Sequence, residues 1–181
     1  MKPFTTFVFL FTLCVAVLPP LIVAHPTNVT KLIRQACAHT AHKALCVDTL
    51  AADPISQGAA NKTGLALVAL RVASQNASDI TELIKASVND PSLAPAVQQG
   101  LSDCMDNYVD AAQQLDDSLA ALLAGAHDDL SIWVNVAIAD SDSCEKSIQG
   151  FKTEMSKENV KFRMLCENAL AIAKAVAVAG N

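Results

Sequence analysis

Apolar residues recur at the three- and four-residue spacing of an α-helix along most of this chain, whereas the alternation typical of β-strands is nearly absent. Alanine, leucine and valine dominate the periodic stretches, which occupy residues 55–88, 95–124, 130–148 and 157–179. Four long helices joined by short connections pack as antiparallel neighbours in an up-down-up-down bundle. The pattern therefore predicts an all-α fold built around a four-helix bundle.

The ends of these stretches are marked by residues that stop or start helices. Asn89-Asp90-Pro91 ends the first stretch, since proline cannot continue a helix and disfavours helix in the residue before it. Pro95 is tolerated in the first turn of the second helix. Gly125 begins the turn that follows, and Asp129 is the expected N-cap of the third helix.

The first 24 residues form a segment of a different kind. Lys2 precedes an apolar run over residues 4–23, and the small residue Ala24 gives an acceptable cleavage site before His25. This is the pattern of a secretory signal peptide, which is removed from the mature protein. The alternative is a retained membrane anchor. The Pro19-Pro20 pair and the lack of a basic cluster after the run argue against it.

Removal of this segment, 1–24, defines the expected domain organisation. Residues 25–181 form a single domain, with 25–54 as an N-terminal helical hairpin and 55–181 as the bundle. The mature part has 18 acidic and 12 basic residues and no cluster of lysine or arginine, so binding to nucleic acid or to an anionic membrane is not expected. Passage through the secretory pathway agrees with three Asn-x-Ser/Thr sequons, at Asn28, Asn61 and Asn76.

Cys37 and Cys46 enclose two histidines, His39 and His42, which leaves three interpretations: a metal site, a thiol-based active site or a disulfide. On one straight helix the two cysteine Cα atoms would lie about 13 Å apart, whereas a disulfide requires about 4.4–6.8 Å. A disulfide therefore demands a chain reversal near Ala41-His42. The spacing lacks the ligand pairs of structural zinc sites, and an oxidising compartment favours the disulfide. We expect a disulfide-closed hairpin, with both histidines as polar residues of its turn.

The remaining cysteines fit the same scheme. In an antiparallel pair of helices, residues equidistant from the turn lie level with each other, and the midpoint of Cys104 and Cys144 is position 124, beside Gly125. The spacing predicts a disulfide that links the second and third bundle helices. Trp133 falls about 20° from Cys144 on the helical wheel and is expected inside the bundle near that disulfide. Cys166 is left over on an apolar stripe, as a buried small hydrophobe or, alternatively, as a reactive or intermolecular thiol.

No motif typical of a hydrolase, a metalloprotease, a phosphate-binding loop or a calcium-binding loop occurs in the sequence. The four histidines have no nucleophile or carboxylate partner at a recognisable spacing. Asp128-Asp129, beside His127, fits the acidic first turn of a helix. We therefore expect a binding protein rather than an enzyme, with neither a cofactor nor a metal.

The second long helix has two distinct faces. At 100° per residue, the positions that cluster near Cys104 predict the inward stripe; they are Tyr108, Ala111, Leu115 and Leu122. Acidic and amide side chains lie opposite them, at Asp106, Asp110, Gln113 and Asp117. A polar outer face is ordinary for a surface helix, but one without lysine or arginine is suited to a basic partner.

Three elements stand out along the mature chain. They are Cys37-x₈-Cys46 followed by Val47-Asp48-Thr49-Leu50, then Cys104-x₃-Tyr108-x-Asp110-Ala111, then Trp133-x₉-Asp142-Ser143-Cys144-Glu145. In this order, with a fifth cysteine near the end, they resemble the plant invertase and pectin methylesterase inhibitors over essentially the whole mature chain. The resemblance implies a four-helix bundle with an N-terminal hairpin, and disulfides that pair the first cysteine with the second and the third with the fourth.

The resemblance also implies a secreted, non-catalytic inhibitor of a carbohydrate-active enzyme, in the apoplast or alternatively the vacuole. Two targets compete. Inhibitors of acid invertase, a β-fructofuranosidase, resemble one another in a Pro-Lys-Phe element between the third and fourth cysteines, and no Pro-Lys-Phe occurs in this chain. Inhibitors of pectin methylesterase instead cover the substrate cleft with bundle helices, through acidic and polar positions that Asp106, Asp110 and Ser143 match. Gln113 and Lys146 depart from that pattern.

The expected function is thus reversible, one-to-one occlusion of the cleft of a pectin methylesterase by a protein that is a monomer when free. Inhibition of acid invertase is the alternative. A hypothesis of another class is a secreted helical carrier that holds a lipid or another apolar ligand inside the bundle, although no sequence feature marks a cavity.

Overall fold

The computed structural model describes residues 29–151 and 154–179, so the expected signal peptide and Asn28 lie outside the described residues. Along the described chain the elements are α1 (Lys31–Ala36), the 3-10 helix η1 (Cys37–His39), α2 (Lys43–Ala52), α3 (Pro54–Gln57), α4 (Lys62–Val88), α5 (Pro95–Ala124), α6 (His127–Ser147) and α7 (Met155–Ala179). None of the described residues lies in a β-strand. The all-α prediction is confirmed.

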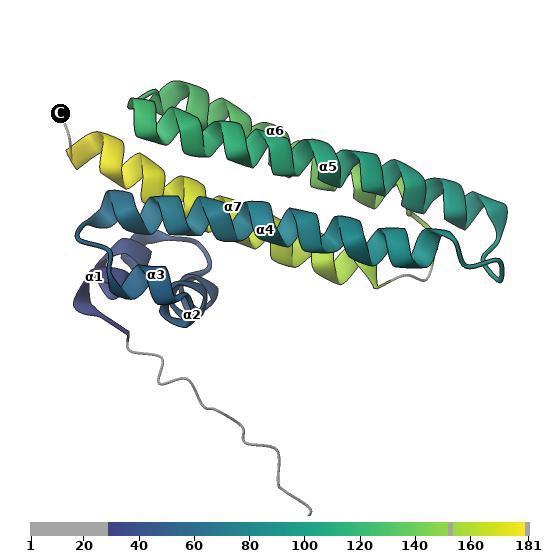
Figure 1. Cartoon of the computed structure of the whole chain (residues 1–181), viewed down its shortest axis with the longest axis horizontal. Coiled ribbons are helices and arrows are strands. Elements are labelled where there is room, and N and C mark those ends of the chain that lie inside the picture. Colours follow the sequence, from purple (N-terminus) through teal and green to yellow (C-terminus); the bar gives the residue numbers. More distant parts are fainter. Residues whose placement is uncertain (1–28, 152–153, 180–181) are drawn as a thin grey trace, which may run out of the picture.

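The four long helices pack as two layers, α5 with α6 and α4 with α7 (Figure 1). α5 contacts α4 and α6, and α7 completes the bundle by contacting the same two helices. Their apolar faces meet in one core, whose fully buried large side chains include Tyr108, Phe162, Leu65, Leu70, Ile80, Leu115, Leu130 and Ile172. Burial of these faces supplies the main driving force for the bundle.

The N-terminal segment α1–α2 forms the predicted hairpin, which packs against α4 and α7. The Cys37–Cys46 disulfide closes it, with Cα atoms 5.8 Å apart. His42 in the turn ties the hairpin to α7 through two bonds with one amide: its N–H donates to Asn168 Oδ1 at 3.2 Å and its carbonyl accepts from Asn168 Nδ2 at 3.1 Å. Its imidazole Nε2 lies 2.7 Å from Glu167 Oε2. His42 therefore holds the hairpin against α7 in addition to lying in its turn.

The first bundle helix differs from the prediction at its start. Residues 55–88 do not form one helix, because the chain leaves helical geometry after α3 and re-enters it at Lys62. Asn61 is extended, with φ −153°, and its Oδ1 accepts the N–H of Gly64 at 3.0 Å. This N-cap bond favours a new helix start over a continuous helix. Apolar spacing continues through the break, which is why periodicity did not reveal it.

The turn between α5 and α6 lies where composition placed it. Gly125 adopts φ 71°, in the left-handed region that glycine enters without a steric penalty, and the N–H of Ala126 reaches back to the carbonyl of Ala121 at 2.9 Å. α6 then begins at His127, so the prediction of Asp129 as its N-cap is wrong. Asp129 lies instead in the first turn, where a negative charge interacts favourably with the helix dipole.

Candidate functional site

The two faces of α5 lie as the sequence predicts. Tyr108, Ala111 and Leu115 are fully buried. Asp106 and Asp110 are exposed on the opposite side, together with Gln113, and Asp117 is partly exposed. Because the buried stripe fixes the rotation of α5 in the bundle, it also fixes the direction in which the acidic side chains point.

Charge separates the two layers of the bundle. α5 contains five aspartates and neither lysine nor arginine, and α6 contains five acidic residues and one lysine. α4 and α7 together contain seven basic and four acidic residues. We call the outward surface of α5 with the adjoining part of α6 the acidic face, defined by Asp106, Asp110, Gln113, Asp117, Asp140 and Ser143.

Several carboxylates of this layer form hydrogen bonds or ion pairs within the chain, whereas others form no ion pair. Asp117 accepts from Gln113 Nε2 at 3.3 Å, and Asp142 of α6 forms an ion pair with Arg163 of α7. Within the described residues, Asp106 and Asp110 form no ion pair. Their charges are therefore available to a partner.

Asp140 of α6 is the partly buried member of the acidic face. One of its carboxylate oxygens, Oδ2, is buried without a hydrogen-bond donor among the described residues. Burial, and secondarily the negative charge of Asp110 on α5, raise the pKa of Asp140 to about 6. The negative charge of the face therefore increases as the pH rises through mildly acidic values.

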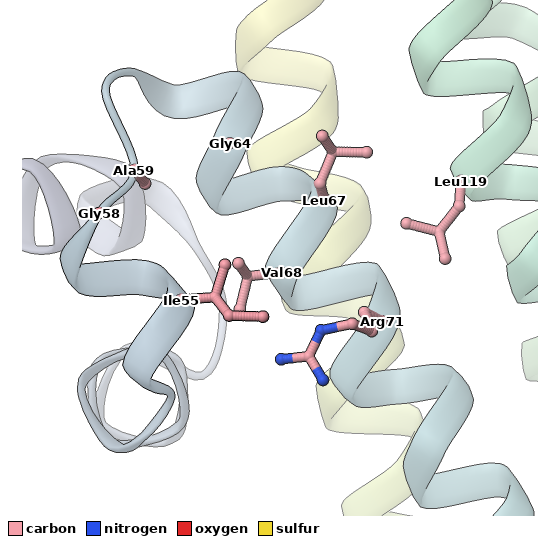
Figure 2. A pocket seen from close by; sticks show the side chains of 8 residues that line it. All are labelled: Ile55, Gly58, Ala59, Gly64, Leu67, Val68, Arg71 and Leu119. Carbon is pink, nitrogen blue, oxygen red and sulfur yellow. The ribbon is translucent and has the colours of Figure 1, made fainter.

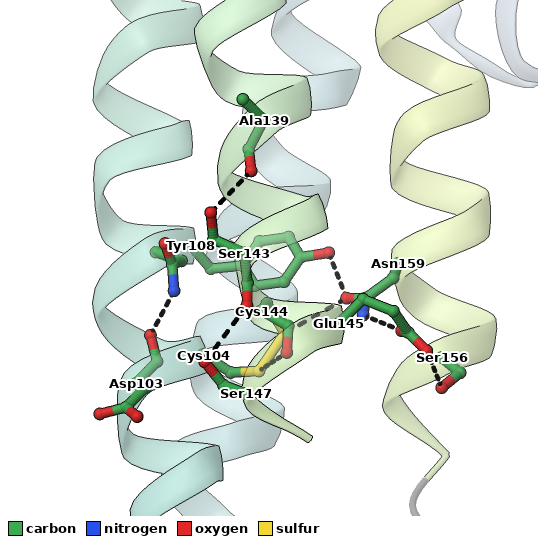
Figure 3. Close-up of a disulfide and its surroundings, with 11 residues drawn as sticks. Asp103, Cys104, Tyr108, Ala139, Ser143, Cys144, Glu145, Ser147, Ser156 and Asn159 are labelled. Carbon is green, nitrogen blue, oxygen red and sulfur yellow. Dashed lines mark hydrogen bonds between the residues drawn. A yellow bond between two sulfur atoms is a disulfide. The ribbon is translucent and has the colours of Figure 1, made fainter. Parts of the chain in front are cut away.

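The seam between α5 and α6 is held at close range. The Cys104–Cys144 disulfide brings the two Cα atoms to 4.3 Å, which confirms the predicted cross-link (Figure 3). One turn before Cys104, Gly100 approaches the end of α6 so closely that a Cβ there would lie 2.5 Å from the carbonyl oxygen of Ser147. A side chain at position 100 would push the helices apart, so glycine is required for this contact.

A buried polar network surrounds the disulfide and joins three helices (Figure 3). Tyr108 Oη donates to Asn159 Oδ1 at 2.7 Å, and Asn159 Nδ2 donates to Glu145 Oε2 at 2.6 Å. Ser156 Oγ donates to the other oxygen of Glu145 at 2.8 Å. The Tyr108 ring also meets Phe162 edge to face, with centroids 5.2 Å apart. Burial raises the pKa of Tyr108 far above its ordinary value, so the phenol stays a donor.

Sequence reasoning did not find this network. Tyr108 and Glu145 were noticed as parts of recurrent elements, but Asn159 and Ser156 on α7 were not. The available signal was an asparagine only three residues before Phe162, on a face that is otherwise apolar. A buried amide at such a position requires hydrogen-bond partners on neighbouring helices.

Ser143 and Trp133 lie on α6 in different settings. Ser143, next to Cys144, donates its hydroxyl to the carbonyl of Ala139 at 3.0 Å and is partly exposed at the acidic face. Trp133 is 37% exposed, so the expectation that it packs inside near the disulfide is wrong. The buried residues of α6 are Leu130, Val134, Ala137, Ser141 and Cys144. On a helical wheel at 100° per residue, the centre of this buried stripe lies about 60° from Trp133. The indole therefore lies at the edge of the buried stripe.

The metal and thiol interpretations of the N-terminal cysteines find no support in this geometry. Both cysteine sulfurs are consumed by the disulfide, and no group of three or more histidine, cysteine, aspartate or glutamate side chains in the described part of the chain is placed to hold a metal ion. Cys166 is the free cysteine of the described chain and is fully buried. Burial raises the pKa of its thiol well above the ordinary value, so the thiol stays protonated and unreactive. The same burial makes it inaccessible to a second chain.

Two pockets bear on the carrier hypothesis. A surface pocket of about 300 Å³ lies between the α3–α4 loop, α4 and α5, lined by Ile55, Gly58, Ala59, Gly64, Leu67, Val68, Arg71 and Leu119 (Figure 2). A second pocket, within the core beside Cys46 and Leu50, has a volume of about 10 Å³, roughly that of one water molecule. Neither provides the enclosed cavity that a lipid carrier requires. None of the helices in residues 29–151 and 154–179 combines the length and apolar character needed to cross a membrane.

The two sequons inside the described residues differ in exposure. Asn61 is exposed at the start of α4, and Asn76 is 8% exposed in the middle of the same helix. Asn28 lies outside the described residues.

Comparison with known proteins identifies the family. The family model described as plant invertase/pectin methylesterase inhibitor matches residues 31–172. A pectinesterase inhibitor from Actinidia deliciosa is 28% identical over 144 residues, which are 78% of this chain and 77% of that protein. A putative invertase inhibitor from Platanus acerifolia is 26% identical over 173 residues, which are 91% of this chain and 96% of that protein.

The fold has a solved counterpart as well. The crystal structure of a mutant form of a pectin methylesterase inhibitor from Arabidopsis matches with a TM-score of 0.67 at 19% identity, covering 80% of this chain and 97% of that one. This likeness supports the helical architecture. Because the family model spans most of the sequence, the chain belongs to the plant invertase/pectin methylesterase inhibitor family.

Proposed function

We propose that the chain inhibits a pectin methylesterase by laying the acidic face of α5 and α6 across the substrate cleft and excluding pectin, in a reversible one-to-one complex. The observation that carries this proposal is the unpaired, exposed pair Asp106 and Asp110 on a helix without lysine or arginine. Surface carboxylates that form no ion pair in the free protein lose no internal contact when a basic partner binds them.

The family consists of enzyme inhibitors, so the chain acts on an enzyme and is not one itself. Rigidity of the binding surface supports inhibition by occlusion, because a preorganised surface loses little conformational entropy on binding. The disulfide, the close approach at Gly100 and the network around Asn159 all hold α5 against its neighbours. Trp133 and Ile132, which are 37% and 57% exposed on α6, add an apolar contact of the kind that anchors protein interfaces.

The protein is further proposed to be secreted into the apoplast, with the vacuole as the alternative, and to be a monomer when free. Residues 1–24 carry the secretory pattern. The two disulfides require an oxidising compartment to form. The buried position of Cys166 supports the monomer, since a folded chain cannot use that thiol for an intermolecular disulfide.

Inhibition of acid invertase is the second candidate, and one observation favours it: the relative from Platanus acerifolia that aligns over 91% of this chain is named a putative invertase inhibitor. Against it, the segment between Cys104 and Cys144 contains no Pro-Lys-Phe element, and the turn there reads Gly125-Ala126-His127.

The test is inhibition of a purified pectin methylesterase and a purified acid invertase side by side, at mildly acidic and at neutral pH. We expect loss of esterase activity at one equivalent of inhibitor, recovery on dilution, and undiminished invertase activity. Inhibition of invertase alone would replace the first proposal with the second. If neither enzyme is inhibited at any pH, both assignments are wrong.

A further inference from the structure

The described chain contains two Asn-x-Ser/Thr sequons in opposite surroundings. Asn61 lies at the exposed end of the bundle, where its Oδ1 accepts the N–H of Gly64 at 3.0 Å and caps α4. Its Nδ2 has no hydrogen-bond partner among the described residues. N-glycosylation modifies Nδ2 and leaves Oδ1 unchanged, so a glycan on Asn61 is compatible with the helix cap.

Asn76 differs from Asn61 in its exposure and in the absence of a cap bond. It lies in the middle of α4, is 8% exposed, and its Oδ1 is buried without a donor among the described residues. The groove above it is bounded by Thr49 of α2 and by Lys161 and Leu165 of α7. A branched oligosaccharide attached at Nδ2 would have to leave through this groove, which has a volume of about 310 Å³, between α2 and α7.

We propose that, of the two sequons in the described residues, Asn61 carries an N-glycan in the folded protein and Asn76 remains unmodified. This inference rests on the secretory route proposed above. Two sequons that the sequence cannot distinguish are thereby separated by burial and by the helix-cap bond that Asn61 makes and Asn76 does not.

The position of Asn61 also predicts what the glycan leaves untouched. In sequence, Asn61 lies between Ala59 and Gly64, which both line the surface pocket of Figure 2, where Leu119 of α5 faces Leu67 of α4. Asp106 is thirteen residues from Leu119 on α5, which is about 20 Å along the helix axis. A glycan at this end lies near the apolar pocket, whose lining residue Ile55 is 59% exposed, and away from Asp106.

Site-resolved glycopeptide mass spectrometry on the full chain, secreted by plant cells into the medium, tests the assignment. Thr63→Val removes the first sequon and keeps the Asn61 cap, and Ser78→Ala removes the second at an exposed position. We expect a glycan on Asn61 in the wild type and in Ser78→Ala, no glycan at that site in Thr63→Val, and an unmodified Asn76 in all three proteins. Inhibition of the target enzyme should be equal for all three.

The outcomes separate the two proposals. Retention of the chain outside the secretory route would contradict the proposed localisation. A glycan on Asn76, or an empty Asn61, in correctly folded secreted protein would overturn the glycan assignment whatever the inhibition assay gives.

Discussion

The α5–α6 layer and the α4–α7 layer bury similar apolar faces but carry opposite charge on their outer surfaces. α5 and α6 hold ten acidic residues and one lysine, whereas α4 and α7 hold seven basic and four acidic residues. Some of these basic residues form ion pairs at the surface of the molecule: Arg71 pairs with Asp53, Lys85 with Glu82, and Arg163 with Asp142 of α6.

The difference indicates which surface has charge available for a partner. Surface ion pairs contribute little to stability, and uncompensated like charges on one layer destabilise the compact state slightly. The acidic layer is also the more tightly fixed of the two, through a disulfide and a buried hydrogen-bond network. Unpaired charge on a rigid surface is the arrangement expected of a docking face.

The largest expected effect comes from removing the Cys104–Cys144 disulfide of the acidic layer. The comparison is removal of the Cys37–Cys46 disulfide in the hairpin that packs against α4 and α7. The closed loops span 40 residues for Cys104–Cys144 and 9 for Cys37–Cys46. On chain entropy alone, the Cys104→Ala/Cys144→Ala pair should lose about 4 kcal/mol of unfolding free energy and the Cys37→Ala/Cys46→Ala pair about 2.6 kcal/mol. Urea unfolding measures both. A larger loss from the hairpin pair would show that the seam is not the main covalent restraint.

The network behind the acidic face gives the next effect. Tyr108→Phe leaves Asn159 Oδ1 without its donor at a position that is 3% exposed, and should cost about 1–3 kcal/mol of unfolding free energy. Ser118→Ala is the control, because the buried Ser118 hydroxyl donates only within its own helix, to the Gln114 carbonyl. We expect a smaller loss there. Inhibition per folded molecule should be unchanged for Tyr108→Phe, since the ring is fully buried and the disulfide still holds α5 in place. A weakened inhibitor would contradict this and show that binding depends on the hydrogen bond from Tyr108 to Asn159.

The smallest effect concerns the pH response of the acidic layer. The pKa of Asp140, about 6 when folded, lies above its ordinary value of 3.8, so the folded state binds the proton more tightly than the unfolded state. The stability from this group is complete below about pH 4 and is lost as the pH rises through about 6. As the pH rises between these values, the unfolding free energy of Asp140→Asn should therefore increase relative to that of the wild type. The increase should be on the order of 1 kcal/mol, because the carboxyl is partly solvated.

Thermal or urea unfolding across this pH range checks the prediction. Asp110→Asn should remove the smaller part of the wild-type response, because burial contributes more than the Asp110 charge. A difference between Asp140→Asn and the wild type that is constant with pH would contradict the assignment.

The sequence predicts those features that depend on one helix or on one turn. Periodicity located the four long helices and the two faces of α5, and the midpoint of Cys104 and Cys144 identified a disulfide across a turn that composition had already placed. Periodicity did not predict the helix break at Asn61, because the apolar spacing continues through it. The N-cap residue Asn61 itself was visible in the sequence.

Features that depend on how helices are rotated against one another were not predictable in this way. Trp133 was placed inside from its wheel angle to Cys144 alone, but eleven residues separate the two, or about 16 Å along the axis, and the true stripe is centred elsewhere. The Tyr108–Asn159–Glu145 network joins three helices whose relative phase a single sequence does not give.

We propose that inhibition depends on the acidic face of α5 and not on the overall negative charge. The most direct measurement is the inhibition constant against pectin methylesterase for Asp106→Lys/Asp110→Lys beside Asp79→Lys/Glu82→Lys, which makes the same charge change at exposed acids of α4. We expect the α5 pair to weaken inhibition at least about tenfold, or about 1.4 kcal/mol, and the α4 pair to change it less than about threefold. Both should keep the helical circular dichroism of the wild type. Unchanged inhibition by the α5 pair, or equal weakening by both pairs, would contradict the claim.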